Sequence, residues 1–389
     1  TDQLLDIIHP QQDRQVKSEK RSSAFFQVSL YKPELKFGIS STETLDANEW
    51  KTVWSIWEKA IASGLGCRVS AGYGQPSKAT GQVLYQTRLK GQGQAAKLID
   101  GTGEFRPNIF RAAIRGHALR IFGGLTDSDT ADRIVEQLFG GIARGGATVG
   151  LLSIAFTEES LEIDDFGQRS YRQPVYRVKG LLTWRLTQTI LEPQKAALTK
   201  LIRALNRFAM MLGGFGKSWR RADHRLIYPD YYDDSDKPLI GCHWEWLGAR
   251  AQQYDTRAHQ LEQVGPYIDQ VRQAAREWMT LQGHTPKSKP ATWREAWHPS
   301  TVQVWGRLAQ EKEDSEAVHW LHGPYRRADR TAGIREGSIY QSDLTGKMGQ
   351  IGRLWHRMYP WIRLRKDPND PRKRIPVPRP ECFELLTIF

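Results

Sequence analysis

Glycines and cations alternate in a short segment of the chain, residues 213–221, which reads Gly-Gly-Phe-Gly-Lys-Ser-Trp-Arg-Arg. Glycine lets a backbone approach a ligand closely and adopt positive φ angles. The three cations that follow, Lys217, Arg220 and Arg221, supply charge for a phosphate. Residues 64–74 repeat this composition, with four glycines around one arginine. Two such loops in one basic chain make a nucleic acid the leading candidate ligand.

A second basic feature lies on a predicted helix over residues 106–122. Arg111 and Arg115 are four residues apart, so they lie on one side of this helix. We expect residues 90–105, just before the helix, to form a glycine-rich polar loop. Arginines placed after such a loop can reach a backbone phosphate, a contact that adds salt dependence to binding but does not read sequence. The alternative is a solvated helix face.

Two residues of this region carry side chains that can transfer protons or bind ions. Asp100 is the only aspartate of the predicted 90–105 loop, and an Asp-Gly pair such as Asp100–Gly101 usually forms a turn. His117 lies on the following helix and has the side chain of a general base. It also falls near the apolar stripe of that helix, where a histidine packs in the core.

Composition limits the alternatives. The 389 residues carry a net charge of +13 with a pI near 9.6, a balance that favours polyanionic partners. Three widely spaced cysteines form no metal-ligand pattern or disulfide framework, which fits a reducing cytoplasm. The sequence contains no run of 18 apolar residues, so it predicts no membrane-spanning helix.

The elements that position these residues predict an α+β protein. Residues 79–250 follow the order β-α-β-β-α-loop-β, which is ferredoxin-like or RRM-like. Within this unit we expect an acidic, turn-rich excursion over residues 158–173. Residues 1–78 show two strands, over residues 25–31 and 35–39, then a helix and a glycine loop, like the back half of such a unit. Residues 1–22 are polar and predict a loop or arm.

Residues 251–389 differ from the rest of the chain. A polar helical stretch over residues 257–281 contains Pro266, which predicts a break. A tryptophan-rich segment follows, and the chain ends in a basic, proline-rich stretch over residues 363–379. We expect a helical insertion or extension with an extended C-terminal arm. The tryptophans could stack on single-stranded RNA or pack between domains.

At this point the residues show a resemblance. The segment Arg106–Arg115, RPNIFRAAIR, is similar to the PGSSLKGALR helix of the CRISPR-associated RAMP superfamily of RRM-like proteins. Arg111 matches the family's lysine and Arg115 its arginine, while Arg106 and Pro107 replace the Pro-Gly at the front. Leu138–Gly140 resembles the family's LFG, and residues 213–219 resemble its C-terminal glycine-rich loop. Residues 64–74 resemble a second copy of this loop, so the resemblance covers residues 25–250.

The resemblance implies a backbone subunit, Cas-seven-like, of a type III CRISPR effector complex in antiviral defence. Such a subunit holds guide RNA next to target RNA and other effector subunits, with residues 158–173 as a thumb that kinks the guide. Subunits of this family often cut target RNA with a metal ion and an aspartate on the loop after the first strand. The resemblance therefore implies Asp100 as the catalytic residue and Mg²⁺ as its cofactor. A basic interaction protein without RNA is a further alternative. The expected RNA-binding residues are Lys90, Gly91, Gly93, Arg111, Arg115, Gly214, Gly216, Lys217, Arg220, Arg221 and Arg68.

Overall fold

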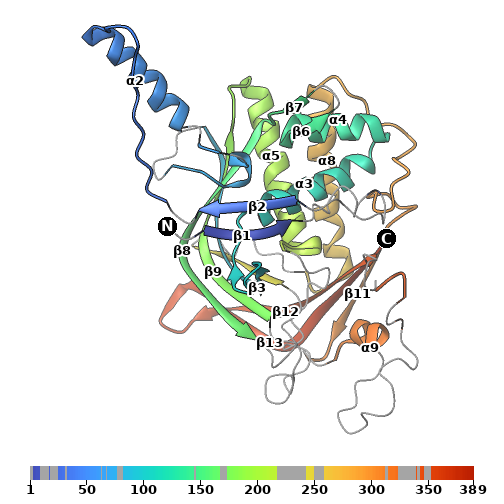
Figure 1. Cartoon of the computed structure of the whole chain (residues 1–389). Coiled ribbons are helices and arrows are strands. Elements are labelled where there is room, and N and C mark those ends of the chain that lie inside the picture. Colours follow the sequence, from blue (N-terminus) through green and yellow to red (C-terminus); the bar gives the residue numbers. More distant parts are fainter. Residues whose placement is uncertain are drawn as a thin grey trace.

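The chain is an α+β protein whose described sheets are all antiparallel (Figure 1). The computed structural model describes residues 3–8, 17, 25–30, 33–62, 64–66, 68–76, 82–143, 146–166, 173–216, 242–248, 258–311, 314–322, 339, 342–345 and 352–389.

A four-stranded sheet forms the centre of the molecule. Its strands are β3 (Val83–Gln94), β8 (Leu152–Phe166), β9 (Gln173–Leu186) and β10 (Cys242–Leu247). They lie in the order β10-β3-β9-β8, so the first strand of the unit is flanked by its last two. Buried and exposed residues alternate along most of β3, as expected for a sheet with one covered and one open face.

Four helices pack together beside this sheet (Figure 1). They are α3 (Asn108–Gly123), α4 (Ser128–Phe139), α5 (Glu192–Phe208) and α8 (Gly265–Leu281). Helix α4 begins where Asp127 caps it, because its Oδ1 accepts a hydrogen bond from the Thr130 amide at 3.0 Å. Pro266 occupies the first turn of α8, where a missing amide costs nothing, so the predicted break is instead a helix start.

The hydrophobic core joins residues far apart in the sequence. Phe110 and Ile114 of α3, Trp184 of β9 and Trp278 of α8 are fully buried in it. Trp355, near the C-terminus, belongs to the same cluster. Residues 79–250 and 251–389 therefore share one continuous core.

The N-terminal part holds β1 (Gln3–Ile8), β2 (Phe25–Leu30) and α2 (Ala47–Ala62). The two strands pair with each other, so the expectation that residues 1–22 form only a loop or arm was wrong. Residues 35–39, expected as a strand, have no regular structure. Helix α2 agrees with the predicted one, carries no buried residue and projects from the body (Figure 1).

A three-stranded sheet ends the chain, formed by β11 (Gln303–Ala309), β12 (Leu354–Asp367) and β13 (Asp370–Ile388) in the order β11-β13-β12. The basic residues 363–379, expected to be an unpaired extended arm, instead form the outer half of the β12–β13 hairpin. The extended backbone was foreseen, but its pairing partner was not.

Short elements complete the structure. They are η1 (Val69–Ala71), β4 (Ala96–Lys97), β5 (Gly103–Glu104), β6 (Gly141–Ala143), β7 (Gly146–Thr148), the π-helical turn η3 (Ala209–Gly213), η5 (Leu261–Gln263) and α9 (Glu316–His322). The predicted 90–105 loop is therefore mostly strand, because β3 runs on to Gln94 and β4 and β5 follow it. Residues 158–166 likewise continue β8 rather than forming turns, while 167–172 lie outside the described residues.

Candidate nucleic-acid interface

Three arginines from two separate segments come together at the first half of α3. Arg111 and Arg115 lie one turn apart on this helix, and Arg68 lies in the first glycine loop. Burial, together with the positive charges of Arg115 and Arg68, lowers the pKa of Arg111 to about 10. A pKa of about 10 keeps Arg111 charged at neutral pH. Arg115 and Arg68, the two charged groups that shift the pKa of Arg111, are both cations, so the three arginines together suit an anion.

Arg111 is held in place by the end of α4. Its Nη2 donates a hydrogen bond to the carbonyl oxygen of Phe139, and its guanidinium lies 5.9 Å from the centre of the Phe139 ring. The Nε atom of Arg111 is buried and has no hydrogen-bond partner in the part of the chain that the structure describes. A guanidinium carries five donors, so this side chain keeps capacity for an anion.

The first glycine loop positions Arg68. The Leu65 amide donates to the Gly74 carbonyl oxygen at 2.9 Å, which closes the loop. Gly74 has a φ of +58°, and a Cβ built on it would lie 1.8 Å from the backbone carbonyl oxygen of Leu65. Only glycine therefore fits at this position. Arg68 itself has a left-handed φ of 62°. η1, which follows it, packs against α3 and β8, so the loop brings Arg68 to the helix.

The second glycine loop packs on another face of α3. Phe215 is fully buried, its ring lies 5.1 Å from that of Phe110, and its carbonyl oxygen accepts a hydrogen bond from Trp244 Nε1 at 3.2 Å. The loop also contacts His117, which lies two residues, and about 200° around the helix, beyond Arg115. Gly214 and Gly216 both have positive φ angles, as the loop's turns require.

The structure describes the second glycine loop only as far as Gly216. The described part of the second loop and the arginine cluster lie on different faces of α3, because α3 is packed on several sides. Lys217, Arg220 and Arg221 lie outside the described residues. His117, a candidate base, is buried between Phe208 and Trp355.

Lys90, Gly91 and Gly93 lie in β3 and not in a loop, contrary to expectation. Lys90 lies on the open face of the sheet, where its Nζ is 3.9 Å from Glu245 Oε2 of β10. Gly91 faces the core, and a Cβ there would lie 2.3 Å from the Trp244 ring. Gly93 is buried as well. Lys90 therefore lies on the open face of the sheet, whereas Gly91 and Gly93 lie on its buried face.

The open face of the central sheet is polar and carries ion pairs. Arg88 donates to Glu159 at 2.9 and 2.6 Å, and Arg177 lies 2.7 Å from Asp164. The β3 residues on this face are Gln86, Arg88, Lys90, Gln92 and Gln94. RRM domains stack bases on aromatic side chains of this face. The residues of this β3 face offer no such platform.

Asp100 lies at the turn between β4 and β5. Its Oδ1 accepts hydrogen bonds from the amide and the hydroxyl of Thr102, at 2.9 and 2.8 Å. These bonds lower the pKa of Asp100, the backbone bond most. This is the geometry of a turn-forming aspartate. Among the described residues, no group of three His, Cys, Asp or Glu side chains is placed to hold a metal ion.

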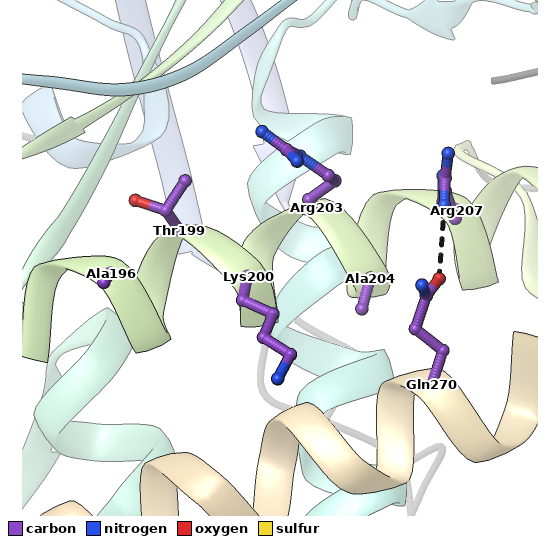
Figure 2. A pocket seen from close by; sticks show the side chains of 7 residues that line it. All are labelled: Ala196, Thr199, Lys200, Arg203, Ala204, Arg207 and Gln270. Carbon is purple, nitrogen blue, oxygen red and sulfur yellow. Dashed lines mark hydrogen bonds between the residues drawn. The ribbon is translucent and has the colours of Figure 1, made fainter. Parts of the chain in front are cut away.

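A second basic surface lies between α5 and α8, in a groove of about 380 Å³ (Figure 2). Helical spacing places Lys200, Arg203 and Arg207 along this side of α5. Lys200 pairs with Glu277 of α8, and Arg207 donates to Gln270 Oε1 at 3.3 Å. Figure 2 shows Lys200 pointing toward α8 and Arg203 pointing away from it, so these cations do not converge. The spacing in the sequence signals the cations, but only the structure reveals their partners on α8.

The sequence matches no protein-family model, and no curated protein matches it. No helix in the described part of the chain combines the length and the apolar character that crossing a membrane requires.

Proposed function

We propose that this chain binds the sugar–phosphate backbone of RNA through Arg68, Arg111 and Arg115. The observation that carries the proposal is the convergence of these three side chains, two from α3 and one from a loop closed by glycines. Like charges close together repel one another, and burial weakens the screening by water. A bound phosphate offsets both costs, and guanidinium groups match its geometry.

The two sequence motifs of the RAMP resemblance meet in space, which supports the proposal. Arg111 belongs to the RPNIFRAAIR segment, and Phe139 to the Leu138–Gly140 motif. The hydrogen bond from Arg111 to the Phe139 carbonyl oxygen joins the two segments, which are 28 residues apart in the chain. Helix α3, which carries the arginines, and the Leu138–Gly140 segment, whose Phe139 carbonyl oxygen holds Arg111, therefore form a single unit.

We further propose that the central unit is ferredoxin-like. The order β3, α3, β8, β9, α5, β10 follows the pattern β-α-β-β-α-β, with α4 added after the first helix. The strand order β10-β3-β9-β8 supports this proposal. RNA would be held beside α3 rather than stacked on the open sheet face, because the β3 side of that face is polar.

In its fullest form, the proposal is a guide-RNA-binding structural subunit of a type III CRISPR complex in the cytoplasm. Its partners would be guide RNA, target RNA and neighbouring effector subunits. The engaged carboxylate of Asp100 favours a structural role over a cleaving one.

Binding is tested with the double variant Arg68→Gln with Arg115→Gln, which leaves the buried Arg111 in place. Single-stranded RNA is titrated by fluorescence anisotropy at several salt concentrations. Each lost phosphate contact reduces the slope of log K against log salt by about 0.7, so we expect a loss of about 1.4 for RNAs of any sequence.

The matched control is Arg133→Gln with Arg276→Gln, which removes the same charge from exposed positions on α4 and α8. An equal change in both variants, or none in the first, contradicts the proposal. The guide-RNA role is tested separately by purifying the protein from its natural host and sequencing the RNA bound to it. A single class of short RNAs with a common repeat-derived end is expected, and RNA of random origin would refute this role.

A further inference from the structure

The outer part of the β12–β13 hairpin, residues 361–380, forms a two-stranded ribbon that we call the basic ribbon. β11 pairs with β13 only from Cys382 onward. In the described part of the chain, residues 361–380 pair only within the hairpin itself. Figure 1 shows the two strands running from the side where the C-terminus lies toward the opposite side of the molecule.

Arginines line one face of the basic ribbon. Arg363 and Arg365 are exposed and two residues apart, so they share a face at a spacing of about 6.6 Å. Across the hairpin they lie opposite Val377 and Ile375, whose side chains share that face. Arg379, two residues beyond Val377, continues the row.

The base of the basic ribbon is held by aromatic contacts. Trp361 stacks on His259 with ring centres 5.2 Å apart and an angle of 10° between planes. Arg379 lies 5.8 Å from the centre of the Trp361 ring. The arginine face therefore starts at a packed anchor next to η5.

The basic ribbon carries a large excess of positive charge. Residues 361–380 contain seven Lys or Arg residues and two acidic ones, Asp367 and Asp370, a net charge of 7 − 2 = +5. Such a density attracts a polyanion over a distance set by screening.

Prolines narrow the choice of partner. Residues 368, 371, 376, 378 and 380 are prolines, which lack the backbone N–H that an added strand would need. The prolines lie in β13 and at the turn, so they disfavour strand addition by another protein at the outer edge of β13, whereas residues 361–367 of β12 contain no proline. Recognition by charge is what its exposed side chains allow.

We infer that the basic ribbon is a second RNA-binding element, which contacts backbone phosphates of a single strand through Arg363 and Arg365. This inference rests on the proposed function, since it takes RNA as the polyanion. Binding through phosphates makes the contact independent of sequence.

The test is the double variant Arg363→Gln with Arg365→Gln in the full chain, with a single-stranded RNA oligonucleotide as the probe. Anisotropy titrations over a range of salt concentrations should show the slope of log K against log salt reduced by about 1.4, for two lost phosphate contacts. Circular dichroism confirms that the variant is folded. The pair Arg133→Gln with Arg276→Gln, which removes the same charge, should leave most of the slope.

The outcomes separate this inference from the proposed function. If the ribbon variant keeps the full slope while Arg68→Gln with Arg115→Gln reduces it, the ribbon inference is overturned and the proposed function stands. If the ribbon variant and the Arg133/Arg276 control reduce the slope equally, the ribbon acts only through net charge and the inference is also overturned. If neither the ribbon variant nor the cluster variant changes binding, the proposed function fails.

Discussion

The imidazole of His117 occupies the space that a side chain at residue 213 would need. A Cβ built on Gly213 would lie 1.9 Å from Cε1 of His117, far inside van der Waals contact. This close contact packs η3, which follows α5, against α3. It also explains in packing terms a glycine that the sequence suggested as part of a ligand-binding loop.

Gly213→Ala should destabilise the protein by about 1–3 kcal/mol, the usual cost of overpacking a core. Urea unfolding followed by circular dichroism measures the change. Gly38→Ala is the matched control, since a Cβ there meets nothing within 4 Å and its stability should barely change. Adding His117→Ala to Gly213→Ala should recover part of the loss, and a purely additive double variant would show that the two residues do not clash.

The buried ion pair between Arg120 and Glu295 gives a second prediction. Arg120 Nε donates to Glu295 Oε2 at 2.8 Å, and its guanidinium lies 5.0 Å from the centre of the Trp355 ring. Both side chains are almost completely buried. Glu295→Ala should cost about 3–5 kcal/mol, because it leaves a buried charge without its partner.

The double variant Arg120→Met with Glu295→Met should be less destabilising than Glu295→Ala, since it removes the charge of Arg120 together with that of Glu295, while Arg294, at 2.9 Å from Glu295, loses this contact in both variants. Thermal and urea unfolding of the variants give the comparison. A double variant that costs as much as the sum of the two single methionine variants would mean that the ion pair contributes little coupling.

Glu384 gives a pH-dependent prediction. Burial raises its pKa, but His356, at 2.9 Å, and the hydrogen bonds from Ser315 and Arg307 outweigh burial and lower the pKa to about 2. The Glu384 carboxylate also holds the start of α9, because its Oε1 accepts a hydrogen bond from the backbone amide of Ala317 at 3.1 Å. The carboxylate therefore stabilises the fold above its unfolded pKa of about 4.3.

This stabilisation should disappear as the pH falls from about 4.3 to about 2, because protonation then favours the unfolded chain. The free energy of unfolding of the native protein and of Glu384→Gln should differ by up to about 3 kcal/mol at pH 6, and the difference should shrink through this window. Urea unfolding at a series of pH values measures it. A difference that is constant with pH would show that the carboxylate charge is not what matters.

Sequence alone determined the local elements of this protein. Apolar residues at helical spacing predicted α3, and the predicted order of elements also included a helix where α2 lies. The apolar stripe of α3 is a local consequence of which residues must face a core, so it can be read without the fold, whereas α2 buries no residue. The same reading identified Arg111 and Arg115 as neighbours, because four residues make about one helical turn.

Only the tertiary structure decided which of these elements meet. The continuation of β3 through Gly91 and Gly93 depends on β9 and β10, which are far away in the chain. The pairing of β1 with β2 and of β12 with β13 depends on contacts between strands that lie nearer in the sequence. Short polar or proline-rich stretches carry no periodic signal, so long-range hydrogen bonds determine their structure. For the same reason, the sequence offered Arg68 and Arg111 as separate candidates, and packing of the glycine loop against α3 brought them together.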